Sequence, residues 1–198
     1  MLTHQVPDPV AISLLILIAF VLSGTMHVLW LRHPLSQPLN IPLDANLTFR
    51  GKRIFGDNKT VRGVLVIVPA TGISFLLISM LQQYLPSWFS NGIWNATHVT
   101  YAFAGILAGL GFILGELPNS FIKRQCNIPS GDVPRRKQWR RVTRITDRID
   151  SILGILLLLS IVMPVPLQTW LYLLILGPAV HSLFSIWLFQ LKIKERPG

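Results

Sequence analysis

The sequence predicts an all-α integral membrane protein with five transmembrane helices, an outside N-terminus and a cytoplasmic C-terminus. Hydrophobic residues make up 51% of the 198 residues and charged residues only 13%, whereas soluble domains carry roughly 25% charged residues. About 20 apolar residues in a helix cross the hydrocarbon of a bilayer. The five expected spans are the apolar segments at about 10–31, 63–81, 100–117, 151–166 and 168–191.

The positions of the cations predict the orientation. All 18 Lys and Arg lie in three places: six between the first and second spans, nine between the third and fourth, and three in the C-terminal tail. The N-terminal segment, the loop around 82–99 and the turn near 164–168 contain none. Positive residues mark cytoplasmic loops, so the three cation-rich segments are predicted to face the cytoplasm. No low-complexity linker or repeat divides the chain, and we expect a single domain over 1–198.

The first span is followed by a proline-containing segment from His33 to Pro42, too broken for a long helix. A polar loop punctuated by glycines then runs into the second span, where Pro69 predicts a kink. The third span contains glycines at four-residue spacing, Gly105 with Gly109 and Gly111 with Gly115. In lipid, small residues at this spacing allow close helix–helix packing, which is the interpretation favoured here.

The basic segment 135–148 is amphipathic. It places seven cations around Trp139, Val142 and Ile145, and spacing of three and four gathers most of the cations on one helical face. Such a segment lies on anionic headgroups. The net charge of +10 is therefore interpreted as a sign of contact with anionic lipid headgroups rather than with nucleic acid. Only one or two of these residues are expected to contact substrate.

Cys126 and His181 are of residue types that often take part in catalysis or metal binding, but we interpret both as structural. Cys126 is the only cysteine, so neither an intrachain disulfide nor a cysteine-based metal site is available, and a free thiol is expected. His181 stands alone among apolar residues of the fifth span, where a packed or locally bonded histidine is favoured over a catalytic one.

Three carboxylates gather at the cytoplasmic ends of two spans. Glu116 lies at the end of the third span, and Asp147 and Asp150 precede the fourth. An ionised carboxylate near hydrocarbon is costly and faces a polar cavity or partner. One hypothesis is a Mg²⁺ site, because Mg²⁺ takes one or two carboxylates and completes its shell with water and substrate phosphate. The other is ion pairing with Arg124 or Arg148, and spacing alone leaves both open.

Basic residues accompany these carboxylates. Lys123 and Arg124 follow Glu116 in the chain, and Lys59 and Arg62 precede the second span. Metal ions and fixed cations together stabilise the charge of a phosphoryl-type transition state. No Ser/His pair is evident in these loops, so the nucleophile of such a reaction is expected to come from a substrate.

Three motifs resemble those of membrane CTP-dependent cytidylyltransferases, the family of phosphatidate cytidylyltransferase and CDP-archaeol synthase. They are Ser-Phe-Ile-Lys-Arg at 120–124, Asp-Arg-Ile-Asp-Ser at 147–151 and Gly-Asp-Asn-Lys-Thr-Val-Arg-Gly at 56–63. The last motif and the five-span size look more like the CDP-archaeol synthase branch. That branch typically has Trp where this chain has Val61, and Asp where it has Glu116. The basic segment also replaces a Pro-Gly-His-Gly-Gly stretch of the phosphatidate branch.

The resemblance implies the reaction of CTP with a lipid phosphate to give CDP-lipid and pyrophosphate. An oxygen of the lipid phosphate attacks the α-phosphorus of CTP in line with the departing pyrophosphate. The implied partners are CTP, a phosphatidate-like or archaeal-type isoprenoid ether lipid phosphate, and the bilayer. The implied location is the cell (inner) membrane, multi-pass, with the active site facing the cytoplasm. A homodimer is left open.

The resemblance also implies residue roles. Asp147 and Asp150 hold Mg²⁺, with Glu116 as a third ligand or as their partner, and Lys123 and Arg124 hold the triphosphate or the lipid phosphate. The implied substrate-binding residues are Asn58, Lys59, Thr60, Arg62, Asn119, Ser120, Arg148 and Ser151.

Two alternatives belong to other classes. A non-enzymatic small transporter or assembly subunit would favour ionisable residues near mid-span or paired broken helices, whereas His181 is the only deep one here. A CDP-alcohol phosphatidyltransferase would carry a longer pattern of aspartates on two helices, which the sequence lacks.

Overall fold

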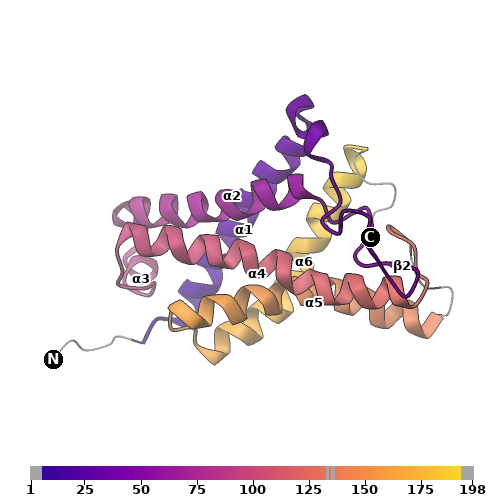
Figure 1. The fold of residues 1–198 in the computed structure, drawn as a ribbon. Coiled ribbons are helices and arrows are strands. Elements are labelled where there is room, and N and C mark those ends of the chain that lie inside the picture. The colour runs from indigo at the N-terminus through magenta and orange to yellow at the C-terminus, as the bar shows by residue number, and fades with distance from the viewer. Residues whose placement is uncertain (1–5, 133, 135–136, 193–198) are drawn as a thin grey trace.

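The computed structural model describes residues 6–132, 134 and 137–192, and almost all of its regular structure is helical (Figure 1). The helices of the bundle are α1 (Pro9–Arg32), α2 (Val61–Leu81), α4 (His98–Gln125), α5 (Lys137–Val162) and α6 (Leu167–Gln190). Shorter elements are η1 (Pro34–Leu39), η2 (Gln82–Tyr84), α3 (Ser87–Ser90) and a hairpin of β1 (Thr48–Phe49) and β2 (Lys52–Arg53).

Four helices are long and apolar enough to cross a membrane: α1, α2 continued through η2, α4 and α6. Their outer faces carry large exposed apolar side chains, among them Leu29, Leu65 and Ile175, which is 72% exposed. A surface of this kind is unusual for a soluble monomer and suits contact with lipid chains. The prediction of an all-α, multi-pass membrane protein is confirmed.

The predicted fourth span, 151–166, overlaps helix α5, which has different bounds. The helix α5 begins at Lys137, in the basic segment, and ends at Val162, before Pro164 and Pro166. Its first half is charged, so α5 is not among the four helices above. Prolines lack the backbone N–H that a helix needs, which explains the early end.

The basic segment is helical from Lys137 onward, as its amphipathic pattern predicts. Trp139, Val142 and Ile145 are exposed, as are Arg140 and Arg141. Two further cations of this segment, Arg135 and Arg136, and the tail residues Lys194 and Arg196 lie outside the described residues.

At the end of the bundle away from the cation-rich loops, hydrogen bonds join the helices and the segments between them. The buried Tyr101 donates its hydroxyl to the Trp94 carbonyl at 2.7 Å, and the Trp94 indole N–H donates to the Pro164 carbonyl at 2.8 Å. Asp8 accepts from the backbone N–H of Val10 and Ala11 and so caps α1. Each of these hydrogen bonds contributes about 1 kcal/mol net to stability.

The glycines of α4 bring it close to two different neighbours. A β-carbon on Gly105 would lie 2.6 Å from the Thr71 carbonyl oxygen of α2. On another face, β-carbons on Gly111 and Gly115 would overlap the backbone of α5 at Gly154 and Asp150. The packing role predicted for these glycines is confirmed, and it places the backbones of α4 and α5 in contact where the acidic residues lie.

Candidate active site

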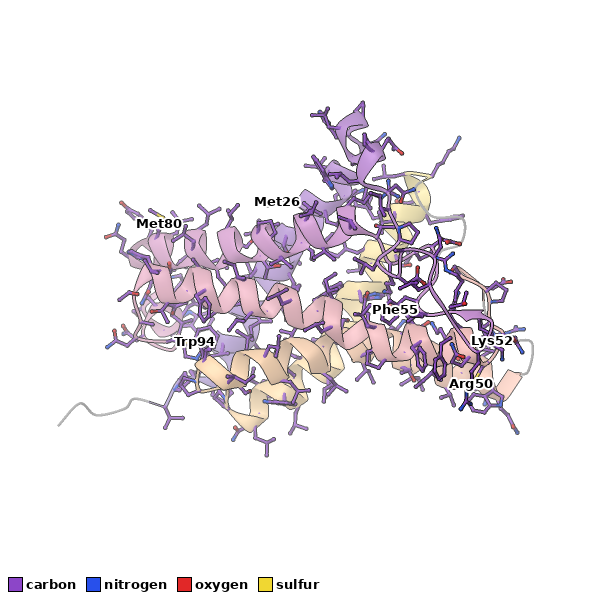
Figure 2. The ribbon with its side chains drawn as sticks, viewed as in Figure 1. Met26, Arg50, Lys52, Phe55, Met80 and Trp94 are labelled. Carbon is purple, nitrogen blue, oxygen red and sulfur yellow. The ribbon has the colours of Figure 1, made fainter. Side chains whose placement is uncertain are left out.

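The predicted site residues gather at one end of the bundle. Figure 2 shows Arg50 and Lys52 at this end and Met80 and Trp94 at the other. The start of α2, the end of α4 and the first half of α5 meet here with the loop that precedes α2.

Asn119 joins the two aspartates of α5. Its Nδ2 donates to Asp147 Oδ1 at 2.6 Å and to Asp150 Oδ2 at 2.7 Å. Lys123, one turn further along α4, forms an ion pair with Asp147, and the Ser151 backbone N–H donates to the other oxygen of Asp150. One face of α4 therefore holds both carboxylates in place, so two of the predicted motifs are in direct contact.

The third motif reaches the same cluster through Lys59. The Lys59 ammonium pairs with Glu116, and only 22% and 15% of these side chains are exposed. Charged side chains at this degree of burial need a partner, because removing water from an isolated charge is costly. The pair ties the loop before α2 to α4, next to the aspartates.

The loop is closed at its base by backbone pairing. Leu43 donates to the Lys59 carbonyl at 2.7 Å and Val61 donates to the Ile41 carbonyl at 2.8 Å, and Pro42 and Thr60 form a bridge. Residues 41 to 61 are thus one compact unit. Lys59 lies at its base and Thr60 at the N-cap of α2.

Asp44 organises the interior of this unit, and the sequence analysis missed it. Its buried carboxylate accepts from the Arg53 guanidinium at 2.7 Å and from the backbone N–H groups of Phe55 and Gly56, each at 2.9 Å. Burial alone would raise the pKa of Asp44, but the hydrogen bonds from Arg53, Gly56, Phe55 and Asn46 outweigh it and hold the pKa below its usual range. The only sequence signal is that Asp44 is one of two acids, with Asp57, in a loop rich in cations.

The hairpin attaches the loop to the end of α4. Arg50 and Gly51, with φ of 51° and 74°, form a tight two-residue turn of the kind that favours glycine. Phe49 packs on Phe121 with ring centroids 5.8 Å apart, and the Lys52 ammonium donates to the Gln125 carbonyl. This contact needs the extension of α4 beyond its apolar segment.

Two guanidinium groups near the cluster have unused donors. Arg124 donates through Nη1 to the Ser130 hydroxyl at 2.7 Å, and this hydroxyl also accepts from the Asp57 backbone N–H. Within the described part of the chain, the buried Nε atoms of Arg62 and Arg124 have no hydrogen-bond partner. Buried donors without a partner are rare in folded proteins, and an anionic ligand would satisfy both.

The other predicted substrate-binding residues surround the cluster less directly. Ser120 and Ser151 are buried, and Asn58 is exposed on the loop. Arg148 is half-buried and takes no part in the hydrogen bonds described above. Ser130, which was not predicted, joins Arg124 to the loop.

The residues present fit a magnesium ion through the two aspartates. Among the described residues, no three His, Cys, Asp or Glu side chains lie close enough together to bind a metal by themselves. The carboxylates of Asp147 and Asp150 nevertheless converge on a single donor atom of Asn119. Two carboxylates suffice for Mg²⁺ when water and substrate phosphates complete its shell. Glu116 is engaged by Lys59, and Mg²⁺ binding stays a prediction.

The fold and this cluster define a class: a multi-pass helical membrane protein with paired carboxylates, lysines and unsatisfied guanidinium donors at one end of the bundle. A family profile described as "CarS-like: CDP-archaeol synthase" matches residues 38–197. The chain belongs to the CDP-archaeol synthase family, which confirms the resemblance found in the sequence.

Individual relatives agree with this assignment. The chain is 30% identical to the CDP-archaeol synthase of Methanospirillum hungatei over 79% of its own length and 89% of that protein. It is 29% identical to the CDP-archaeol synthase of Thermofilum pendens, with 79% of this chain and 65% of that one covered.

One solved structure shares the fold. It is described as an intramembrane enzyme for archaeal membrane lipids biosynthesis, and it superposes with a TM-score of 0.59 over 85% of this chain and 92% of that one. At 19% identity this likeness concerns the fold alone.

Proposed function

We propose that this protein catalyses CTP-dependent cytidylyl transfer to an archaeal-type lipid phosphate, giving CDP-lipid and pyrophosphate in phospholipid biosynthesis. Family membership over residues 38–197 supports the reaction and the lipid class. One observation carries the proposal for these residues. Lys59, from the loop before α2, and Asn119 and Lys123, from α4, engage the carboxylates of Glu116, Asp147 and Asp150 in one cluster.

In the proposed reaction, an oxygen of the lipid phosphate forms a bond to the α-phosphorus of CTP while the bond from that phosphorus to pyrophosphate breaks. Asp147 and Asp150 hold Mg²⁺, with Asn119 orienting both carboxylates. When bound, Mg²⁺ neutralises part of the triphosphate charge. Lys123 binds a phosphate oxygen as the nucleotide replaces part of its contact with Asp147.

The guanidinium N–H donors of Arg62 and Arg124 bind phosphate in the proposed reaction. Arg62 and Arg124 offer Nε–H groups to the phosphates, and charge-assisted hydrogen bonds of this kind are about twice as strong as neutral ones. Lys59 lies between the loop and Glu116 and holds the loop over the bound nucleotide.

The proposed topology has five spans, with the N-terminus outside and the site at the cytoplasmic face. The apolar second half of α5 supplies the short fifth crossing. Arg32 at the end of α1, Arg62 at the start of α2 and Arg124 near the end of α4 support this orientation through the positive-inside rule. It places the cluster on the side where CTP is available.

The decisive experiment incubates the purified protein in detergent with CTP, Mg²⁺ and a panel of lipid phosphates, with isoprenoid-ether and diacyl chains. Mass spectrometry should detect CDP-lipid, and a coupled assay should detect one pyrophosphate per CDP-lipid. The Asp150→Asn variant is the negative control. A lack of CDP-lipid from every lipid phosphate would favour the non-enzymatic alternative.

A further inference from the structure

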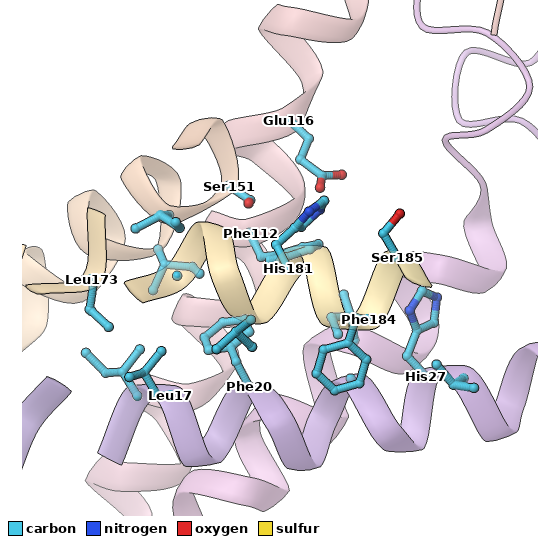
Figure 3. A pocket seen from close by; sticks show the side chains of 18 of the residues that line it. Leu17, Phe20, His27, Phe112, Glu116, Ser151, Leu173, His181, Phe184 and Ser185 are labelled. Atoms are coloured by element: carbon cyan, nitrogen blue, oxygen red, sulfur yellow. The ribbon is translucent and has the colours of Figure 1, made fainter. Parts of the chain in front are cut away.

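A cavity of about 260 Å³ lies inside the bundle, beside the carboxylate cluster, and α1 and α6 supply most of its wall (Figure 3). The lining is predominantly apolar and includes Leu17, Phe20, Phe112, Leu173 and Phe184. We call it the α1–α6 cavity. An apolar wall of this kind does not suit CTP, whose phosphates and base need polar partners.

The α1–α6 cavity is continuous with the candidate active site. Glu116, Ser151 and His181 are part of its lining, and Figure 3 shows the Glu116 carboxylate and the His181 ring close together, away from Leu17 and Leu173. Glu116 is the residue that pairs with Lys59. One end of the cavity therefore opens on the residues proposed to handle phosphate, and the other end is hydrocarbon-like. His181, for which the sequence favoured a packed or locally bonded role, lies in this wall.

The dimensions suit one lipid chain. On α1 the lining runs from Ile16 to Val28, which is about 18 Å at a rise of 1.5 Å per residue. That is close to one leaflet of a hydrocarbon core about 30 Å thick. The volume is near the lower limit of about 300 Å³ for small-molecule pockets, so the cavity holds part of a lipid rather than a whole two-chain molecule.

We infer that the α1–α6 cavity binds one hydrocarbon chain of the lipid phosphate substrate, with the phosphate at the Glu116 end. This inference rests on the proposed function, because that function supplies a substrate with a chain and a phosphate. The second chain stays in the bilayer. Lys59 offsets the negative charge of Glu116 and allows a phosphate to lie close to it.

Two glycines set the width of the cavity. Gly24 of α1 and Gly177 of α6 both line it. A β-carbon on Gly24 would lie 2.9 Å from the Phe184 ring, and one on Gly177 would lie 2.5 Å from Ile152 Cδ1. Both Phe184 and Ile152 line the cavity, so an added methyl group must displace one of these side chains and thereby changes the space left for a methyl-branched chain. Gly24 and Gly177 are thus specificity-determining residues.

The first test compares Gly24→Ala and Gly177→Ala with Gly72→Ala. Gly72 is a control of similar crowding, because its β-carbon would lie 2.8 Å from Ile106 Cγ1 and 3.3 Å from the Ala102 carbonyl oxygen, but Gly72 is not part of the cavity wall. Initial rates are measured at saturating CTP with lipid phosphates of branched, straight and short chains. CTP binding is measured separately to show that each variant is folded.

The two cavity variants should raise KM for branched lipid phosphates by roughly tenfold, the discrimination expected for about one methylene in an apolar pocket. KM for short straight chains and CTP binding should stay unchanged, and Gly72→Ala should leave the whole series unchanged. Equal KM shifts for all lipids, or none, would overturn the inference. If the wild-type protein makes no CDP-lipid from any lipid, the proposed function fails instead.

A second measurement needs no variant. A lipid phosphate carrying a diazirine near the end of one chain is photolysed with the wild-type protein, and labelled peptides are identified. We expect labels within 16–28 of α1 and 173–188 of α6, and competition by unlabelled lipid phosphate. Labels confined to outward-facing residues, or equal competition by a phosphocholine lipid, would show that the cavity is no substrate site.

Discussion

The backbone of Asp150 on α5 lies against Gly115 of α4, so its carbonyl oxygen occupies the space that a β-carbon on residue 115 would need. One turn along α4, Asn119 reaches the Asp150 side chain at 2.7 Å. The absence of a side chain at one position thus allows the hydrogen bond at the next turn. Helix packing and the geometry of the carboxylates depend on the same contact.

The first prediction concerns Gly115→Ala. The new methyl group meets backbone rather than a movable side chain, so α4 and α5 must separate. Overpacking of this kind costs about 1–3 kcal/mol. We expect a lower Tm in detergent and a loss of cytidylyl transfer. In Gly72→Ala, where a side chain can move away, both should change little, and an unchanged rate in Gly115→Ala would disprove the dependence.

The second prediction concerns the aspartates. Asp147→Asn and Asp150→Asn keep the size of each side chain and remove its charge. Both variants should insert and purify normally but lose activity by roughly 100-fold or more, which corresponds to about 2.7 kcal/mol of transition-state stabilisation. Rates are measured across Mg²⁺ concentrations. Near-normal rates in both variants would make these carboxylates structural.

The third prediction concerns the Lys59–Glu116 pair. Lys59→Met leaves the partly buried carboxylate without its partner and should destabilise the protein by about 1–3 kcal/mol. The double variant Lys59→Met, Glu116→Gln should recover part of this loss. A double-mutant cycle on thermal stability measures the coupling, and a coupling near zero would show that the pair does not hold the loop in solution.

The fourth prediction is a pH dependence from Asp44. Its folded-state pKa is held below the usual range, so its stabilisation is complete above the unfolded pKa of about 3.9 and is lost as the pH falls toward the folded pKa. Asp44→Asn should therefore lower stability by about 1.5–3 kcal/mol between pH 5 and pH 7. The gap between variant and wild type should narrow only below about pH 4. A gap that closes at neutral pH would contradict this assignment.

The fifth prediction concerns the exposed cations at the start of α5. Each surface cation contributes roughly 1 kcal/mol to attraction by anionic lipids. Arg140→Gln with Arg141→Gln should weaken vesicle activity modestly when the vesicles are anionic and little in neutral detergent. A collapse of the rate in detergent would instead place these arginines among the catalytic groups.

Sequence patterns predicted the helices and several of the residues that meet in the carboxylate cluster, because both rest on local signals. Apolar runs mark the helices, although α4 continues as far as Gln125, beyond the apolar segment 100–117. Four-residue glycine spacing predicted close packing. It could not show that Gly105 faces α2 while Gly115 faces α5, because spacing does not identify a neighbour.

Contacts between segments that are far apart in the sequence could not be predicted from it. The pairing of Lys59 with Glu116 and the role of Asp44 depend on how a loop folds back, which no periodicity records. The hairpin strands have two residues each, too few to alternate visibly. The bounds of α5 were wrong because its charged first half continues as helix in contact with the end of α4.

The continuity of α5 has a mechanical consequence. One uninterrupted helix carries the exposed Trp139, the two aspartates, and Gly154, whose backbone packs against α4. If Gly154 acts as the pivot, Asp147 lies about 10 Å from it along the axis and Trp139 about 22 Å. A tilt of about 5° then moves Asp147 by about 1 Å, a displacement that can change a rate about 100-fold. A contact that tilts the charged first half of α5 would therefore also shift the Asp147 and Asp150 carboxylates relative to α4.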